Sequence, residues 1–204
     1  MGTDKSLKWS SRPSPEQVRK YQEKWNELDH YVSNEKSLEK LFTEIYPENN
    51  NKDEVLIKID VLNSFYSTNL LPHEFAPVAD RIIASAIDKH LQNPEPDFAL
   101  VEEIAHPNDE DHVPKLRNCY SFATKYCSHH CPEVYPIYDG NVDEMLWYFK
   151  NEFYDFKRRH LKDYKKFYEV LKKFKEFYKL EKFSWKEIDR YLWQAGKEKA
   201  KSPE

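Results

Sequence analysis

Four side chains that are able to bind zinc stand close together in the middle of the chain: Cys127, His129, His130 and Cys131. Zinc sites normally take their ligand pairs from two separate elements, whereas these four residues crowd into about one helical turn. His106 and His112 are weak candidates for a second pair of zinc ligands. We expect no bound metal and no cofactor, and a small metal-dependent hydrolase remains the weaker alternative.

A single carboxylate, Asp139, follows the extended and half-apolar stretch 135–138. Behind it, Val142, Leu146 and Phe149 have the spacing of an apolar helix face. Asp139 therefore stands where an N-cap is expected, and capping is the ordinary role of an aspartate in that position. The residues on both sides of Asp139 in the sequence weaken this ordinary interpretation and make it a candidate for a chemical role.

The elements that must position these residues are helices. Only 3 of the 204 residues are glycine, alternating strand patterns are absent, and Lys, Glu and Leu are plentiful. We predict an all-α, compact multi-helix domain over residues 14–196, with a flexible segment 1–13 and a frayed tail 197–204. The expected helices begin at Ser14, cover about 38–45 after a break at Ser33–Asn34, and then cover 53–67, 75–87, 98–105 and 121–131. Further helices are expected after Asp139, within 151–178 and from Ser184.

The compartment follows from what the sequence lacks. Three clustered cysteines are too few for a disulfide framework, and no apolar run approaches the length of a membrane span. The first residues contain no apolar signal-peptide core. We expect a cytoplasmic protein, a monomer without membrane contact.

The C-terminal third is locally basic. Residues 150–182 contain 12 lysines and arginines against 6 acidic residues, and aromatic side chains are interleaved with them. Such a stretch is able to follow a phosphate backbone, with Arg158 and Arg159 as candidate contacts. A solvated helix face over a core of aromatic residues is an equally good interpretation.

The run 121–142, SFATKYCSHHCPEVYPIYDGNV, resembles the centre of the helix-hairpin-helix DNA glycosylases, the relatives of endonuclease III. Ala123 takes the small position of their helix, and residues 136–142 match their P-[VI]-D-x-x-[VI] segment with Tyr138 as one extra residue. Residues 61–69 and 78–82 are similar to their upstream helices, which places Asn69 where the family fills the gap left by a flipped base. The resemblance covers about residues 55–148 and implies two helical lobes that flank a cleft.

The glycine-rich hairpin of that superfamily is replaced here by residues 113–120, so the hairpin is degenerate. Lys115 and Arg117 are the alternative phosphate anchors that the match offers. The hairpin lysine of the bifunctional members falls near Ser121, with Lys125 one turn further on, so the match offers no Schiff-base amine. The resemblance therefore implies a monofunctional enzyme whose backbone contacts include Ser121 and Lys125. The iron–sulfur motif of some members is absent.

The chemistry fits this resemblance. Breaking an N-glycosidic bond develops positive charge on the sugar, which one carboxylate such as Asp139 is able to stabilise while it orients water. The base must leave the helical stack for an aromatic pocket. The candidate pocket residues are Tyr120, Tyr126, Tyr135, Tyr138 and Trp147. The leading hypothesis is a glycosylase acting on double-stranded DNA with a flipped base, in repair or in antiviral defence against phage DNA with modified bases. The alternative is an inactive nucleic-acid-binding or protein-interaction module.

Overall fold

The computed structural model describes residues 12–107 and 116–201, and within these ranges the chain forms helices and no strand. This confirms the predicted all-α class. The elements are α1 (Pro15–Asn26), α2 (Asp29–Lys40), the π-helical turn η1 (Leu41–Ile45), α3 (Lys52–Tyr66), α4 (Pro72–Ala84), α5 (Ile87–His90), α6 (Phe98–Ala105), α7 (Tyr120–His130), α8 (Gly140–Phe153), the 3-10 turn η2 (Arg158–Lys162), α9 (Tyr164–Tyr178) and α10 (Trp185–Lys201).

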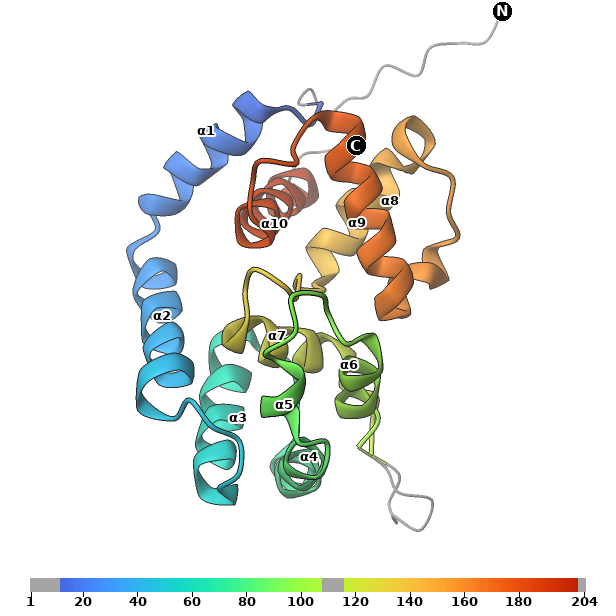
Figure 1. Cartoon of the computed structure of the whole chain (residues 1–204). Helices are drawn as coiled ribbons and strands as arrows, with labels where there is room; N and C mark the ends of the chain where they lie inside the picture. The colour runs from blue at the N-terminus through green and yellow to red at the C-terminus, as the bar shows by residue number, and fades with distance from the viewer. Residues whose placement is uncertain (1–11, 108–115, 202–204) are drawn as a thin grey trace, which may run out of the picture.

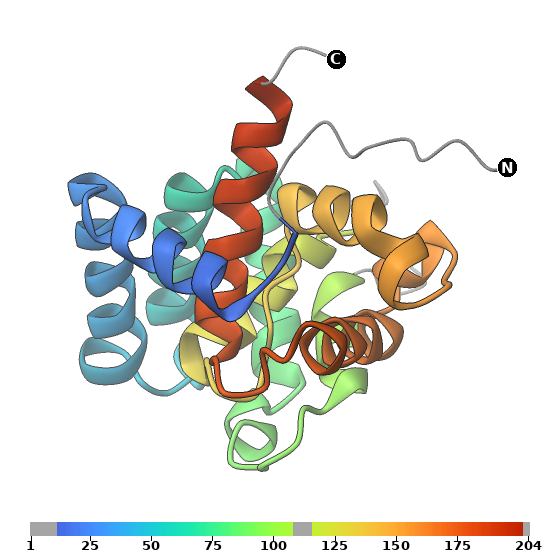
Figure 2. The ribbon, with the colours of Figure 1, turned by 90° about the horizontal axis from the view of Figure 1, so that it is seen from above.

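The helices form two groups that share one core (Figure 1). Helices α3 to α7 make the first group, in which α3 packs on α4 and α6 packs on α7. Helices α8, α9 and α10 make the second, and α1 lies across α10 (Figure 2). Buried apolar side chains of both groups pack into one hydrophobic cluster, which includes residues from Val18 on α1 to Ala195 on α10. Helix α10 therefore packs both on α1 and on α8, which lies in the later middle of the sequence.

Three helix starts carry the caps that the sequence predicts. The Ser14 hydroxyl accepts a hydrogen bond from the Gln17 amide at 3.3 Å. Ser184 and Glu187 form the expected reciprocal capping box, with the Ser184 amide donating to the Glu187 carboxylate at 2.8 Å and the Glu187 amide donating to the Ser184 hydroxyl at 3.2 Å. Asp139 caps α8.

One expectation about helix boundaries, the break at Ser33–Asn34, is wrong. α2 continues through Ser33 and Asn34, and the chain turns earlier, at Glu27 and Leu28. The Ser37 hydroxyl donates to the Ser33 carbonyl inside the helix, so these polar residues do not compete with it. The long C-terminal stretch is interrupted between α8 and α9 by an extended segment and η2. Across the described part of the chain, no helix has the length and apolar character to cross a membrane.

Candidate active site

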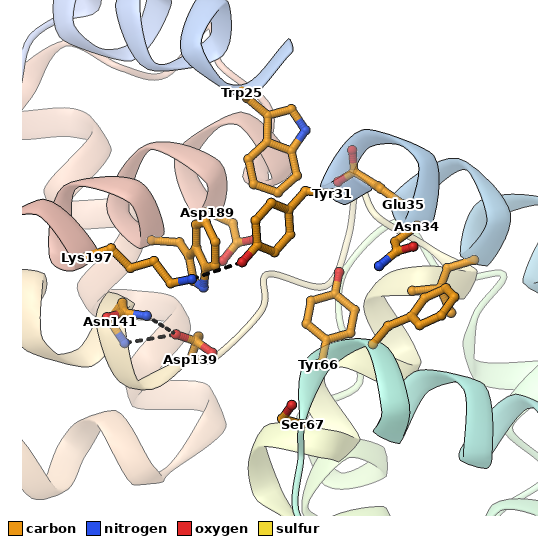
Figure 3. A pocket seen from close by; sticks show the side chains of 13 residues that line it. Trp25, Tyr31, Asn34, Glu35, Tyr66, Ser67, Asp139, Asn141, Asp189 and Lys197 are labelled. Carbon is orange, nitrogen blue, oxygen red and sulfur yellow. Dashed lines mark hydrogen bonds between the residues drawn. The ribbon is translucent and has the colours of Figure 1, made fainter. Parts of the chain in front are cut away.

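A cavity of about 320 Å³ lies beside Asp139, between α1, α2 and α10 (Figure 3). Its walls come from α1, α2, the end of α3, the first turn of α8 and α10. Trp25, Tyr31, Phe65, Tyr66 and Trp193 give it aromatic walls. Its volume and its mixture of aromatic and polar groups are those of a site for a small organic molecule.

Asp139 uses its two oxygens differently. Oδ1 accepts hydrogen bonds from the Asn141 backbone amide at 2.9 Å and from the Asn141 side-chain amide at 3.2 Å. Oδ2 lies 3.5 Å from Nζ of Lys125. The side chain is 22% exposed and contributes to the cavity wall. Capping therefore occupies one oxygen, and the other belongs to a carboxylate–ammonium pair beside the cavity.

Lys125 is held inside the protein behind Asp139. Its ammonium donates to the Ser121 hydroxyl at 2.7 Å and to the Tyr138 carbonyl at 3.1 Å, and it lies 5.3 Å from the centre of the Tyr66 ring. Burial lowers the pKa of Lys125, and the nearby Asp139 charge opposes that shift. The predicted phosphate contact of Lys125 is wrong, because a side chain with 2% exposure cannot reach a phosphate. Lys125 therefore places a buried amine beside Asp139, at a position where the family match offers no Schiff-base lysine.

Three aromatic rings meet at one end of the cavity. The ring centres of Trp25 and Tyr31 are 5.8 Å apart, and the Trp193 ring is 5.0 Å from that of Tyr31. Lys197 lies over this cluster, with Nζ 3.8 Å from the centre of the Trp193 ring and 3.2 Å from the Tyr31 hydroxyl (Figure 3). Such walls stack well on a flat heterocycle.

Two buried polar atoms of the cavity residues have no hydrogen-bond partner among the described residues. They are Nε1 of Trp25 and Oδ1 of Asp189. Burial, followed by the charge of Asp139, raises the pKa of Asp189 to about 7. Buried polar groups in folded proteins are normally satisfied, so these two indicate a site with capacity for a ligand or water.

The aromatic residues predicted for the pocket lie elsewhere. Tyr120, Tyr126 and Tyr135 are core residues with at most 6% exposure, so this part of the prediction is wrong. Tyr138 is 5% exposed, and its hydroxyl donates to Asp143 at 2.9 Å. Trp147 lies in the middle of α8 and packs on Phe156, which follows that helix. Side chains that pack in a helical core and those that line a pocket have the same sequence pattern, which explains the error.

Asn69 and Arg117 lie together beside the start of α4. Asn69 is exposed in a left-handed conformation with φ of 63°, and its carbonyl accepts a hydrogen bond from Arg117. Arg117 also pairs with the buried Glu74 at 2.9 Å, which lowers the pKa of Glu74 to about 2. Asn69 does not line the cavity, although Ser67 does. Its gap-filling role stays a prediction, as does phosphate binding by Arg117; Lys115 lies outside the described residues.

The other residues that are predicted to contact the DNA backbone differ in their exposure and in the protein groups that they already bind. The Ser121 hydroxyl donates to the Tyr138 carbonyl at 3.2 Å and accepts from Lys125, so it is committed to the interior. Arg158 binds Asp143 at 2.7 Å and Glu144 at 2.9 Å. Arg159 is exposed beside a shallow hollow, and the other residues that line this hollow are Tyr138, Gly140, Asp143, Arg158 and Lys162. The hollow adjoins Asp139 through Gly140.

The Cys/His cluster does not converge on a common point. Nε2 of His129 is 3.0 Å from the Tyr66 hydroxyl, whereas Nε2 of His130 is 3.1 Å from Oδ1 of Asn49. The Cys131 thiol points to the Leu91 carbonyl at 3.5 Å, and Cys127 is fully buried. Consistent with this divergence, the described residues contain no group of three or more side chains that could hold a metal ion. These side chains therefore do not share a common ligand position in the described structure, and His112 lies outside the described ranges.

The residues that complete the site were missed in the sequence. The spacing of Trp25 is that of an ordinary amphipathic helix face, which predicts a core residue. Tyr31 lies close to the expected helix break at Ser33–Asn34. Asp189 and Trp193 share one face of α10 at a spacing of four residues, which is the only local signal that they act together. Their approach to Asp139 depends on contacts between residues that are 50 to 114 positions apart in the sequence, which periodicity does not reveal.

Comparison with known proteins places the chain in a family. A model described as the HI_0787_N N-terminal domain matches residues 17–134, which reach from α1 to the turn that precedes Asp139. An uncharacterized protein of Haemophilus influenzae is 42% identical over 147 residues, which cover 71% of this chain and 67% of the relative. No solved structure matches the chain. On the extent of these matches, the chain belongs to the HI_0787_N family.

Proposed function

We propose that this protein is a monofunctional DNA glycosylase that hydrolyses the bond between a damaged or modified base and its sugar. The observation that carries the proposal is Asp139, a carboxylate at the mouth of an aromatic cavity, with Oδ2 3.5 Å from a buried ammonium. The arrangement of α7, an extended segment and an aspartate capping α8 also supports the likeness to the helix-hairpin-helix glycosylases.

In this proposal the cavity receives the extruded base, and Trp25, Tyr31 and Trp193 supply the stacking surfaces. The sugar then lies at Asp139, where charge develops as the bond to the base breaks. A fixed carboxylate in a water-poor site stabilises that charge and orients the water that attacks the sugar. Lys125 is a positioning residue, because its ammonium fixes Oδ2 of Asp139.

The DNA backbone has a suitable place beside the cavity. The hollow lined by Gly140, Arg159 and Lys162 lies at the N-terminus of α8, directly after Asp139 in the chain. Helix N-termini and basic side chains both favour phosphate. A nucleotide with its sugar at Asp139 is thereby able to place a flanking phosphate in the hollow.

The monofunctional assignment rests on the confinement of Lys125. Its ammonium is surrounded by Ser121, Tyr138 and Asp139, and Lys125 is not among the described residues that line the cavity. Water rather than the amine is therefore the expected nucleophile. Borohydride added during turnover traps an amine–sugar adduct if one forms, and we expect no covalent protein–DNA product.

The test is base release from duplexes with oxidised, deaminated or alkylated bases and from phage DNA with natural base modifications. Alkali cleavage reveals the abasic sites, and the type of DNA that is processed separates a repair role from a defence role. We expect Asp139→Asn to abolish release and to keep or raise DNA affinity, since asparagine retains the capping oxygen and loses the charge.

A second candidate function is an inactive DNA-binding or protein-interaction module of the same fold. The observation that favours it concerns Arg117, which lies in the segment that replaces the hairpin. Its guanidinium is paired with Glu74 of α4 and is therefore already occupied by a carboxylate. This candidate predicts DNA binding or partner binding without abasic product from any substrate. It also predicts that Asp139→Asn has no effect on function.

A further inference from the structure

Asp189 is a second carboxyl group on the wall of the cavity that contains Asp139 (Figure 3). It lies in the second turn of α10, one helical turn before Trp193. Its Oδ1 atom is inaccessible to solvent and accepts no hydrogen bond from any described residue. No ion pair of Asp189 is found in the described part of the chain, although Glu35 nearby is paired with Lys186 at 3.4 Å and also with Arg190.

The surroundings of Asp189 favour its neutral form. Burial has the largest effect and raises its pKa to about 7, and the negative charges of Asp139 and Glu35 act in the same direction. Lys125 and Lys186 oppose this shift without cancelling it. The titratable or charged groups that face Asp189 or line the same cavity are Asp139 at the N-cap of α8, Lys125 of α7, Tyr31 and Glu35 of α2, Tyr66 of α3, and Lys186 and Lys197 of α10.

Two carboxyl groups in one cavity, one neutral and one paired with an ammonium, are able to divide acid and base roles between them. Glycoside-cleaving enzymes use such a division, in which one carboxylic acid protonates the leaving group and a carboxylate acts on the sugar. Asp139 already has the second role in the proposed function. Asp189 has the properties that the first role requires.

We propose that Asp189 is the catalytic acid of this site, which donates its proton to a ring nitrogen of the base as the base departs. The inference rests on the proposed glycosylase function and adds to it the residue that activates the leaving group. It also names the substrate class: a neutral base that is a poor leaving group until it is protonated.

The step balances as a hydrolysis. The bond between the sugar carbon and the base nitrogen breaks, and its electron pair stays with the base. The proton of Asp189 moves to the base, and water adds to the sugar carbon and gives its own proton to Asp139. The products are the free neutral base and a sugar hydroxyl, and Asp189 regains the proton through exchange with solvent.

The experiment compares wild type with Asp189→Asn in single-turnover base release between pH 5.5 and 8.5, on the base that the wild type releases fastest. Asparagine has the same shape and cannot donate a carboxylic proton. We expect the wild-type rate to fall about tenfold per pH unit above pH 7, and the variant to be on the order of 100-fold slower at pH 6 without that fall. DNA affinity stays within about threefold of wild type, because the lost proton transfer belongs to the chemical step.

Asp155→Asn is the matched control, since Asp155 is 97% exposed and does not line the cavity. We expect it to keep both the rate and the pH dependence. A variant Asp189→Asn that releases base within threefold of wild type at pH 6 overturns the acid role. So does a slower variant that retains the wild-type fall above pH 7, because that pattern indicates a structural role. Absence of release by the wild type from every substrate instead overturns the proposed function and the acid role with it.

Discussion

At the scale of single residues, the site depends on a buried ammonium that holds a carboxylate. Lys125→Met removes the charge 3.5 Å from Oδ2 of Asp139 and keeps much of the side-chain volume. We expect base release to fall by at least about tenfold while the fold is kept, because the carboxylate loses the group that fixes it. Release assays with thermal melting measure both effects. Lys165→Met, at an exposed position of α9, is the control, and equal release by the two variants would show that Lys125 has no part in the reaction.

Asp189 gives a second expectation at this scale. A carboxyl whose pKa is raised to about 7 is neutral in the folded protein and ionised in the unfolded chain over the interval between its ordinary pKa and pH 7. Above pH 7 the folded state must hold a charge in a poor environment. Asp189→Asn removes that charge, so we expect a higher melting temperature than wild type at pH 8. A lower melting temperature at pH 8 would mean that the carboxylate is stabilised in the fold.

The sequence indicated the residue at the centre of the site and missed the residues around it. Asp139 was identified because its N-cap position and its extended aromatic approach are local features. The pocket was assigned to Tyr120, Tyr126 and Tyr135, which lie in the core. Residue type does not distinguish these core tyrosines from the cavity residues Trp25 and Trp193. Whether an aromatic side chain is covered or lines the cavity depends on how the neighbouring helices pack.

At the scale of elements, the cavity depends on the close approach of α10 to the first turn of α8. A Cβ atom at Gly196 would lie 2.8 Å from Cβ of Asn141 and 3.0 Å from its carbonyl oxygen. Gly196→Ala therefore forces the two helices apart, and we expect a loss of about 1–3 kcal/mol in the free energy of unfolding, with slower base release. Urea unfolding measures the loss.

Gly140→Ala is the matched control for that experiment. No atom outside its immediate neighbours lies within 4 Å of a Cβ placed there, so the substitution meets open space. We expect unchanged stability or a gain of a few tenths of a kcal/mol up to about 1 kcal/mol, from the stiffer unfolded chain. Equal losses in the two variants would contradict the tight crossing at Gly196.

Helix existence was predictable from the sequence, and helix arrangement was not. Ser14 and Ser184 marked their helices correctly, because capping is decided within four residues. The expected break at Ser33–Asn34 failed, since polar residues on an exposed face are compatible with a helix that is fixed by packing elsewhere. The closure of α1 and α10 on Asp139 has no local cause, so only the folded structure reveals it.

At the scale of the whole molecule, stability is expected to fall in mild acid. Burial lowers the pKa of His129 and of His130 to about 3, so both stay neutral in the folded protein below pH 6.5, where the unfolded chain binds two more protons. Asp189 acts in the opposite direction, because the folded state holds one extra proton there. These three groups together leave a difference of one proton, which lowers the free energy of unfolding by about 1.4 kcal/mol per pH unit between pH 6 and pH 4.5. Glu74, whose pKa is lowered to about 2, adds to this fall as the pH approaches the ordinary pKa of a glutamate.

Urea unfolding at several pH values measures this slope. His129→Gln removes one of the two buried imidazoles, and we expect it to flatten the dependence. His106→Gln, at an exposed histidine, is expected to leave the slope as it is in wild type. A stability that is constant or rising from pH 6 to pH 4.5 would contradict the burial of neutral histidines in α7.

The most direct test of the central claim is mass spectrometry of the small molecules released when the wild type and Asp139→Asn act on modified duplex DNA. A glycosylase with Asp139 as its catalytic carboxylate gives a free base and an intact abasic strand with the wild type, and neither product with the variant. If Asp139→Asn releases the base as fast as wild type, or if both bind DNA and release nothing, the aromatic cavity beside Asp139 is not a base-excision site.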